Sequence, residues 1–227
     1  MSSVTIKPLN WDQVDTVLLD MDGTLLDLNF DNFFWTQHLP RRFSELHAAP
    51  LTAVSDEMQN RLQEKQGSLD WYCTDYWSAE FNLNIIALKQ ECKHLICERP
   101  QALQFLKQLN AMGKRTILVT NADRAGIKLK FSATKIEPLL HTVVSSHDYG
   151  IPKEEQQFWQ KLKRDLAFDP AQTVFIDDSE SVLRAAKKFG IKHIFVVTQP
   201  DSSQVRQISN EFQPLTNFMD LMGSSHG

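Results

Sequence analysis

A single short apolar run constrains the fold of this chain more than any other feature: residues 16–19, Thr-Val-Leu-Leu, which lead directly into Asp20-Met21-Asp22-Gly23-Thr24. Such a run is typical of a strand that is buried on both faces of a sheet. Active sites of α/β proteins collect just beyond the carboxyl ends of these strands. A carboxylate there can act as a nucleophile or bind a cation, and a second one can move protons. Asp-Gly pairs also mark ordinary turns, so other segments must decide.

Three further segments place reactive side chains at predicted strand ends or helix starts. Residues 116–121 form an apolar run that ends in Thr120 and Asn121, and residues 173–179 form one that contains Asp177 and Asp178. Lys153 lies in a loop before a predicted helix. A carboxylate pair, a hydroxyl, a lysine and an acid pair therefore follow one another in a fixed order, which favours a site over a turn.

This order of motifs resembles the haloacid dehalogenase-like (HAD) hydrolases over nearly the whole chain, with the motifs DMDGT, VTN, PK and IDDSE. Within that superfamily, LLDMDGTLLDLNFDNFFW, WYCTDYW and the chain length are similar to the bacterial purine nucleotidases that dephosphorylate GMP and IMP. The resemblance implies an α/β fold with a doubly wound, mainly parallel Rossmann-like sheet and an inserted helical cap of the C1 type. It also implies a Mg²⁺-dependent phosphomonoesterase that works through an aspartyl phosphate.

The resemblance implies a role for each motif residue. Asp20 attacks phosphorus in line, and Asp22 protonates the leaving alkoxide and then activates water. The dehalogenases of this superfamily lack the second aspartate, because halide leaves without a proton. Thr120 and Asn121 donate to phosphoryl oxygens, and Lys153 neutralises charge on the nucleophile and the transferring group.

Carboxylates beside a dianionic phosphate require a hard cation between them, which predicts Mg²⁺. The expected protein ligands are Asp20, the backbone carbonyl of Asp22, and Asp177 or Asp178. Alignment with the common Gly-Asp-Ser form of the motif favours Asp178 for direct contact, although an acid pair that caps the following helix is the alternative. The chain has Gly-Ile-Pro-Lys-Glu where many relatives have Lys-Pro, so the geometry of the lysine loop stays open.

Strand and helix patterns alternate along the rest of the chain, as expected for an α/β core. Further strands are predicted at residues 141–145 and 193–197, with helices from Arg99-Pro100 to Gly113 and at 180–189. The segment between Asp27 and Glu98 lacks this alternation and is too long for a βα loop. We therefore expect a catalytic core at 1–27 and 99–227 and a helical cap at 28–98. An apolar cluster between Leu215 and Met222 is expected to dock on the core, and residues 223–227 to form a disordered end.

Several residues are weaker candidates for substrate contact. An aromatic side chain that stacks on a purine contributes on the order of 1–3 kcal/mol, and two aromatic groups qualify: Trp71, Tyr72, Tyr76 and Trp77 in the cap, and Phe30, Phe33, Phe34 and Trp35, with Asp31 among them, at the border of cap and core. Packing within the cap is the expected role for most of them. His147-Asp148 is expected to lie in a loop, and Asp123 and Arg124 either reach the substrate or cap a helix.

Composition excludes some partners. The formal net charge of −4 opposes general binding to a nucleic-acid backbone. The three cysteines, Cys73, Cys92 and Cys97, lack metal-site spacing and are expected to be reduced and mostly buried. No segment resembles a signal peptide or a membrane helix, so we expect a cytoplasmic enzyme without a membrane partner. The oligomeric state stays open.

Three functions compete at this stage. The first is a nucleoside 5′-monophosphate phosphatase that prefers purines and acts on a small-molecule phosphate monoester. The second is a sugar-phosphate phosphatase or phosphomutase of the same superfamily, which the motifs cannot distinguish because the difference lies in the cap. The third is a nucleotide-binding regulator that has lost catalysis.

Overall fold

The computed structural model describes residues 9–206 and 209–223. Among these residues one sheet of six strands has the order β3-β2-β1-β4-β5-β6, and every neighbouring pair is parallel. Its strands are β1 (Thr16–Leu19), β2 (Arg115–Thr120), β3 (Thr142–Ser145), β4 (Thr173–Asp177), β5 (His193–Val197) and β6 (Gln213–Leu215). The chain extends the sheet from β1 to one side and then crosses to β4 on the other, so the predicted doubly wound α/β fold is confirmed.

The strands form because their side chains are buried on both faces of the sheet. In β1 every residue is buried, and Val17 and Leu19 belong to one apolar cluster whereas Leu18 belongs to another. Phe175 in β4 belongs to the second cluster as well, on the same face as Leu18. This alternation explains why the run reads as continuously apolar in sequence.

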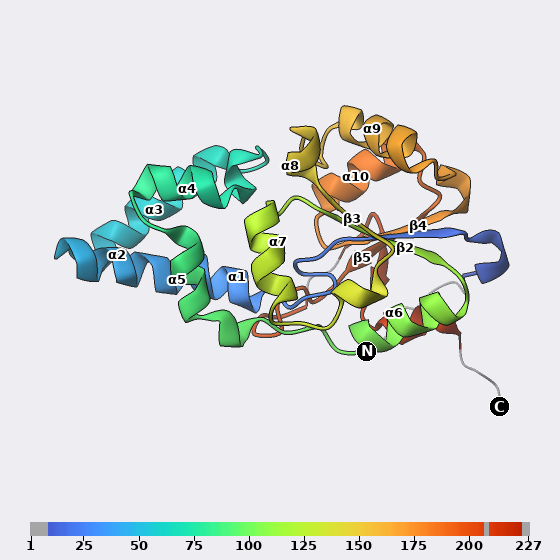
Figure 1. Cartoon of the computed structure of the whole chain (residues 1–227), viewed down its shortest axis with the longest axis horizontal. Coiled ribbons are helices and arrows are strands. Elements are labelled where there is room, and N and C mark those ends of the chain that lie inside the picture. Colours follow the sequence, from blue (N-terminus) through green and yellow to red (C-terminus); the bar gives the residue numbers. More distant parts are fainter. Residues whose placement is uncertain (1–8, 207–208, 224–227) are drawn as a thin grey trace.

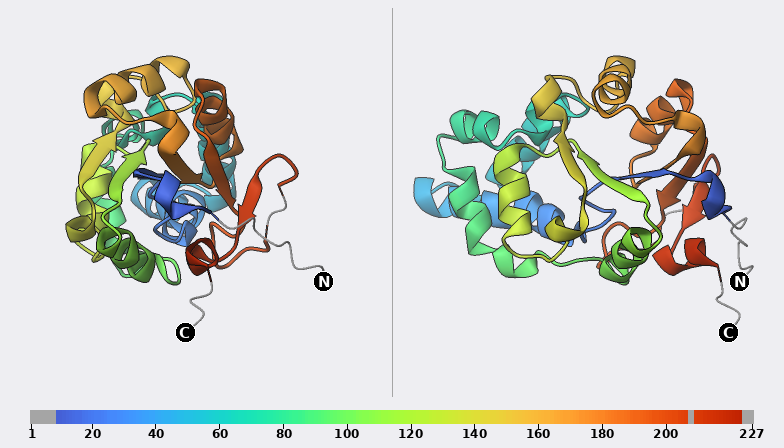
Figure 2. Two further views of the ribbon diagram at one scale, coloured as in Figure 1. Left: turned by 90° about the vertical axis from the view of Figure 1, so that its right-hand side faces the viewer. Right: turned by 45° about the vertical axis from the view of Figure 1, so that its right-hand side comes forward.

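Helices cover both faces of this sheet (Figures 1 and 2). On one face lie α6 (Ala102–Ala111), α7 (Arg124–Phe131) and the 3-10 helix η7 (Phe218–Met222), which supply part of the first cluster. On the other face lie α9 (Gln156–Leu166) and α10 (Glu180–Phe189), which supply most of the helical part of the second. The remaining core elements are the short helix α8 (Ser146–Tyr149) and the 3-10 helices η1 (Trp11–Gln13), η5 (Glu137–Leu139) and η6 (Pro170–Gln172).

A helical lobe lies beyond the carboxyl edge of the sheet and is drawn on the left of Figure 1. It contains the helices α1 (Asn29–Phe33), α2 (Leu39–His47), α3 (Leu51–Lys65), α4 (Thr74–Phe81) and α5 (Ile85–Glu91), the π-helix η2 (Phe34–His38) and the 3-10 helices η3 (Asp70–Tyr72) and η4 (Lys93–Leu95). The chain leaves and re-enters the core at one place: the backbone N–H of Asp27 donates to Cys97, and that of Arg99 donates to Leu25. This arrangement is that of an inserted segment, and the domain limits 28–98 stay a prediction.

Local differences from the sequence expectations have simple causes. The strand β6 escapes prediction because Pro214 lacks a backbone N–H; the proline is tolerated here since β6 is an edge strand. The helix after Arg99-Pro100 begins at Ala102, because Gln101 adopts φ +65° immediately before it. The docking of the C-terminal cluster is confirmed, with Leu215, Phe218 and Leu221 all buried. The expected disordered end, residues 223–227, lies outside the described residues except for Gly223.

The three cysteines were expected to be mostly buried, and this expectation is only partly confirmed. Cys92 is buried and Cys73 is half-buried, but Cys97 is exposed beside the point where the helical lobe rejoins the core. All three are free thiols. No helix in the described ranges has the length and apolarity needed to span a membrane.

Candidate active site

The first carboxylate pair lies at the carboxyl end of the central strand β1. The backbone N–H of Asp20 donates to the carbonyl of Ile176 in β4 at 3.0 Å, which continues the pairing of the two strands. Met21 is fully buried, whereas Asp20 and Asp22 line a cavity. The two-residue spacing therefore sends the intervening side chain into the core and both carboxylates towards the same space.

Gly23 allows the turn that follows and also makes room for a second acid pair. Its φ is +80°, and a Cβ atom built at this position would lie 2.5 Å from Oδ2 of Asp178. The backbone N–H of Gly23 donates to Leu26, and that of Leu26 donates to Met21, which closes a tight turn. Only glycine combines this backbone with the close approach of a carboxylate.

Lys153 connects the strand ends. Its Nζ atom lies 2.5 Å from Oδ1 of Asp20, 2.7 Å from Oδ2 of Asp177 and 3.1 Å from the carbonyl of Val119. Although burial lowers the pKa of Lys153, the two carboxylates outweigh it and hold the pKa above its usual range. The lysine therefore stays charged at the floor of the cavity, with all three protons donated.

The loop that carries Lys153 is fixed from three sides. Its backbone N–H donates to Oδ1 of Asn121 at 3.0 Å, and its carbonyl accepts from the indole of Trp159 at 2.7 Å. One amide hydrogen of Asn121 is donated to Glu154, which also accepts from the hydroxyl of Tyr72. Asn121 therefore orients the lysine loop through both atoms of its amide.

Thr120 lies at the end of β2 and lines the same cavity. Its hydroxyl oxygen accepts the backbone N–H of Ala122 at 3.0 Å. A hydroxyl that accepts in this way can still donate its own proton. The predicted role of Thr120 as a donor to an anion is thus compatible with its local contacts.

Three carboxylates crowd together beside Lys153. Asp20, Asp177 and Asp178 each offer an oxygen within 4.8 Å of the others. Burial, opposed by Lys153 and assisted by Asp177, raises the pKa of Asp20 to about 7. Burial also raises the pKa of Asp177, and burial together with the two neighbouring acids raises that of Asp178 well above its usual value. An all-oxygen set with more negative than positive charge suits a hard divalent cation, which would favour the ionised forms.

The Asp22 side chain does not belong to this set of three acids and contacts a second group of charges. Its Oδ1 lies 2.6 Å from Nζ of Lys130, which also contacts Asp31 at 2.7 Å, and Asp31 contacts Lys89 at 3.0 Å. Burial raises the pKa of Asp22 to about 6 against the opposing effect of Lys130. For Asp31 burial also raises the pKa, but the two lysines outweigh it and hold the value below the usual range.

A cavity of about 650 Å³ joins both charged groups to the helical lobe. Its core side contains all of the sequence-predicted site residues: Asp20, Asp22, Thr120, Asn121, Lys153, Asp177 and Asp178. Its lobe side contains Trp35, Trp71 and Tyr72 together with Gln59, Leu62, Gln63 and Gln66 of α3 and its C-cap. Of the aromatic candidates, Trp77, Phe30 and Phe34 are buried in the first apolar cluster instead.

Other candidates lie outside the site or support it from behind. His147-Asp148 forms part of the one-turn helix α8 and not a loop, because Asp148 closes a capping box with Ser145. Asp123 caps α7 through Oδ1 and accepts from the backbone and hydroxyl of Thr74 through Oδ2, so it joins core and lobe. Both roles considered for it are therefore compatible with its position on the cavity wall.

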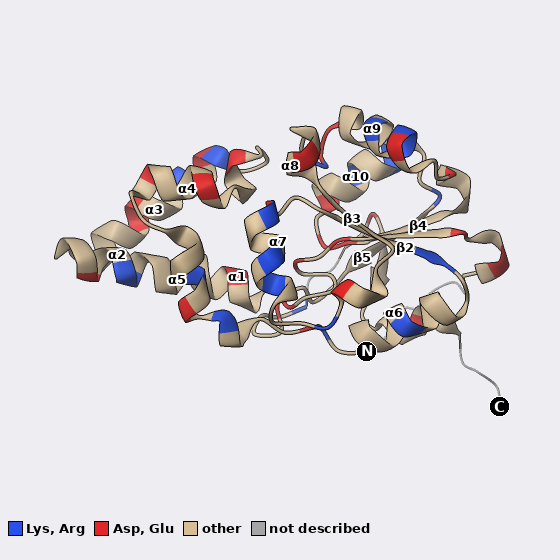
Figure 3. Ribbon diagram, viewed as in Figure 1, with Lys and Arg blue, Asp and Glu red and all other residues tan. Residues whose placement is uncertain are grey.

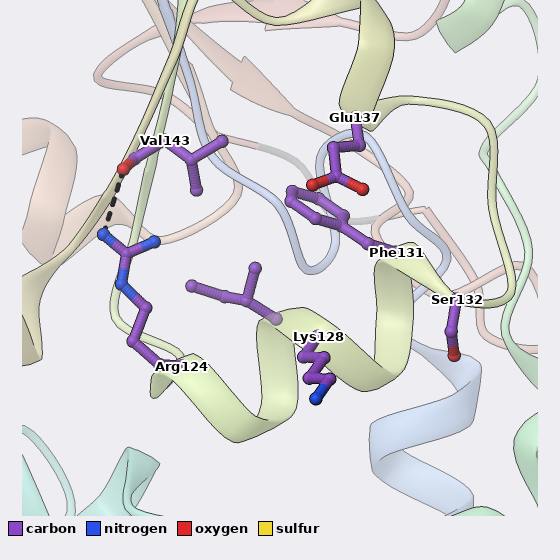
Figure 4. Close-up of a pocket in the computed structure, with 7 residues that line it drawn as sticks. Arg124, Lys128, Phe131, Ser132, Glu137 and Val143 are labelled. Carbon is purple, nitrogen blue, oxygen red and sulfur yellow. Dashed lines mark hydrogen bonds between the residues drawn. The ribbon is translucent and has the colours of Figure 1, made fainter.

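Arg124 points away from this cavity. It donates to Asp148 and to the carbonyl of Val143. Arg124 and Val143 line a separate, open hollow of about 450 Å³ beside α7 (Figure 4). That hollow contains Lys128 and Phe131 but no member of the four motifs. Figure 3 shows α7, with its basic residues, between the helical lobe and the sheet.

Sequence reasoning missed Lys89, Lys130 and Glu154. Lys89 and Lys130 lie in helices, where a lysine side chain normally faces water. Only their low exposure in the structure, 5% for Lys89 and 3% for Lys130, identifies them. A lysine that falls on the apolar side of a helical pattern is the one signal that could have found Lys130, which lies between Leu129 and Phe131.

The fold and this charged edge define a Rossmann-like α/β enzyme core with a lobe over its site, and the comparisons with known proteins agree. The sequence pattern of the haloacid dehalogenase-like hydrolases matches residues 14–190. The chain is 37% identical over 214 residues to the GMP/IMP nucleotidase YrfG of Escherichia coli K12, which covers 94% of this chain and 96% of that protein.

Two solved structures share the fold. One is an HAD phosphatase from Thermococcus onnurineus, with a TM-score of 0.75 and 19% identity over 92% of this chain and 98% of that one. The other is a predicted phosphoglycolate phosphatase from Haemophilus somnus, with a TM-score of 0.68 and 17% identity over 92% and 97%.

The chain belongs to the haloacid dehalogenase-like hydrolases. The family expectation is therefore confirmed, as is the expectation of an enzyme of the phosphoric monoester hydrolase class.

Proposed function

We propose that this enzyme is a Mg²⁺-dependent nucleoside 5′-monophosphate phosphatase that prefers purines such as GMP and IMP. The observation that carries the proposal is the position of Lys153, whose Nζ lies between Asp20 and Asp177 at the floor of a cavity large enough for a nucleotide. The substrate is a small phosphate monoester and not a nucleic-acid polymer.

Asp20 is the proposed nucleophile. It attacks phosphorus opposite the leaving oxygen and forms an aspartyl phosphate, which splits one slow displacement into two steps. Lys153 neutralises the carboxylate and the phosphoryl oxygens, and Thr120 and the amide of Asn121 donate to those oxygens. Positioning and charge neutralisation of this kind supply most of the catalysis in phosphoryl transfer.

Asp20, Asp177, Asp178 and the backbone carbonyl of Asp22 are the proposed Mg²⁺ ligands. The fit rests on the all-oxygen donor set and on the cradle at Gly23, which a Cβ atom would fill. Asp177 already contacts Lys153, so Asp178 is the better candidate for direct contact. When bound, Mg²⁺ neutralises the negative charge of the site and of the phosphate.

Asp22 is the proposed acid and base. It lies two residues from the nucleophile, lines the same cavity, and stays outside the cluster of three acids. A carboxyl there can protonate the leaving 5′ oxygen and later take a proton from the water that hydrolyses the intermediate.

The purine preference rests on the nucleotidase relative and on the lobe side of the cavity. Trp35, Trp71 and Tyr72 can pack against a base. Gln59 and Gln63 lie one turn apart on α3, and Gln66 is its C-cap residue; amides can both donate to and accept from the edge of a purine. An apolar wall with a polar stripe suits a heteroaromatic leaving group better than a bare sugar.

The test is phosphate release from GMP, IMP, AMP, UMP and ribose 5-phosphate, with Mg²⁺ or with EDTA. We expect Mg²⁺-dependent turnover that favours GMP and IMP. Asp20→Asn should lower kcat by at least about 10⁴-fold, as expected for loss of a covalent nucleophile, whereas Asp165→Asn, a change of an exposed acid on α9, should not.

Each failure has a separate meaning. Faster turnover of sugar phosphates would keep the chemistry and replace the purine assignment with the sugar-phosphate alternative. Binding of nucleotides without turnover would favour a nucleotide-binding regulator that has lost catalysis. Full activity in EDTA would show that the reaction does not require Mg²⁺. We place the reaction in the cytoplasm, which the three free thiols support.

A further inference from the structure

Four charged side chains form a chain of contacts from the proposed acid into the helical lobe. Lys130 on α7 bridges Asp22 and Asp31, at 2.6 Å and 2.7 Å, and the other oxygen of Asp31 contacts Lys89 at 3.0 Å. These residues come from the loop after β1, from α7, from α1 and from α5. All four line the large cavity.

The two lysines are held rigidly. Lys130 is 3% exposed and Lys89 is 5% exposed. The Lys89 ammonium lies between 5.1 and 5.6 Å from the ring centres of Phe30, Phe34 and Trp35, and that of Lys130 lies 5.8 Å from Phe30. Buried ions are costly unless they are paired, so the lobe supplies Asp31 as the partner that retains Lys130.

The contacts of Lys130 differ from those expected of a phosphate-binding lysine. Lys153 already occupies the place beside the nucleophile, whereas Lys130 contacts Oδ1 of Asp22. In the described part of the chain no other side chain forms an ion pair with the Asp22 carboxyl. An ammonium can donate to one oxygen of a carboxyl whether or not the other oxygen carries a proton, so this contact orients Asp22 in both states.

We propose that Lys130 is a positioning residue for Asp22, and that Asp31 of the lobe, held by Lys89, keeps Lys130 in place. The proposal rests on the proposed function, because a positioned acid matters only when the leaving group needs a proton. As the Asp20–phosphorus bond forms, the phosphorus–O5′ bond breaks, and its electron pair stays on O5′, which takes the proton of Asp22. Lys130 keeps its three protons throughout.

The test compares two leaving groups in each variant. A purine nucleotide releases an alkoxide that needs the proton, whereas 4-nitrophenyl phosphate releases a phenolate that is stable without it. The measured quantity is kcat/KM, which reports steps up to departure of the leaving group and excludes hydrolysis of the aspartyl phosphate. The variants are Lys130→Met, Asp31→Asn and Lys128→Met, in which Lys128 is the exposed lysine of the same helix.

General acid catalysis contributes about 10²–10⁴-fold, so Lys130→Met should lower kcat/KM for the nucleotide by roughly 10–10²-fold and that for the aryl phosphate by less than about 3-fold. Asp31→Asn should show the same selectivity with a smaller loss, and Lys128→Met should change neither. Equal losses for both substrates in Lys130→Met would overturn the proposal, because a phosphate-binding or merely structural lysine affects both.

Folding is followed by thermal unfolding of each variant. If Lys130→Met does not fold, Asp31→Asn decides, since both lysines remain in it: a loss confined to the nucleotide supports the proposal, and equal losses or none overturn it. A wild-type enzyme that hydrolyses neither substrate would contradict the proposed function itself.

Discussion

At the scale of single residues, Gly23 has a backbone conformation that favours glycine and lies against Asp178, a proposed metal ligand. Its φ of +80° is similar to the +67° of Gly113. A Cβ atom added at Gly23 would lie 2.5 Å from Oδ2 of Asp178, whereas one added at Gly113 would meet nothing within 4 Å. Gly113→Ala adds the same backbone strain in open space, about 1–2 kcal/mol. A comparison of Gly23→Ala with Gly113→Ala therefore separates the effect of backbone strain from the effect of displacing the Asp178 carboxylate.

We expect Gly23→Ala to raise the Mg²⁺ concentration required for half-maximal activity by about 10-fold or more, which corresponds to roughly 1.4 kcal/mol. Gly113→Ala should lower the melting temperature because of the backbone strain, as Gly23→Ala should, but it should leave the Mg²⁺ requirement unchanged. Titration of activity with Mg²⁺ measures this, and an equal Mg²⁺ requirement in both variants would contradict the role given to the glycine cradle.

At the scale of elements, the segment from η3 to α4 presents two aromatic side chains in similar surroundings but with different access. Trp71 and Tyr76 are both half-buried and both pack on the main apolar cluster, yet only Trp71 lines the cavity. We expect Trp71→Leu to raise KM for GMP by about 5–150-fold, the equivalent of 1–3 kcal/mol of stacking.

Ribose 5-phosphate is the control substrate because it lacks a base, and its KM should stay within about 2-fold of the wild-type value if Trp71 acts only through stacking. Tyr76→Leu is the control variant and should leave both KM values unchanged. A rise in KM for both substrates would instead indicate that Trp71 shapes the lobe without touching the base.

At the scale of the whole molecule, the acid cluster links stability to pH and to metal. Burial raises the pKa of Asp20 to about 7, so between about pH 4 and pH 7 the folded state holds a proton that the unfolded state has released. The free energy of unfolding must therefore fall as pH rises through this range. Asp31, whose pKa is lowered, contributes stability throughout this range and loses that contribution only at more acidic pH.

In EDTA we expect the melting temperature to fall between about pH 4 and about pH 7, because the buried Asp20 carboxyl must ionise in the folded state. Mg²⁺ binds the ionised cluster of the folded state, and at 100 times its Kd it should add about 2.7 kcal/mol at the higher pH. Differential scanning calorimetry measures both effects. A Mg²⁺-induced stabilisation that does not grow with pH would count against this cluster as the metal site.

Much of this protein is determined by its sequence alone. Continuous apolar runs must be buried on both faces, and polar residues at their ends must meet at one edge of a parallel sheet, so the order of residues is enough to bring Asp20, Thr120 and Asp177 together. Gly23 is identifiable for a similar reason, because a strand that ends in acids and turns sharply requires its backbone freedom.

Only the tertiary structure decided which lobe residues share the cavity with these motifs. Trp71 and Trp77 have the same residue type in one short segment, yet one faces the cavity and the other is fully buried. Lys130 and Asp31 are nearly a hundred residues apart, and their contact depends on how α7 and α1 pack. Local patterns report which face of an element is apolar, but the partner that covers that face follows from packing of the whole chain, and hence the network behind Asp22 could not be predicted.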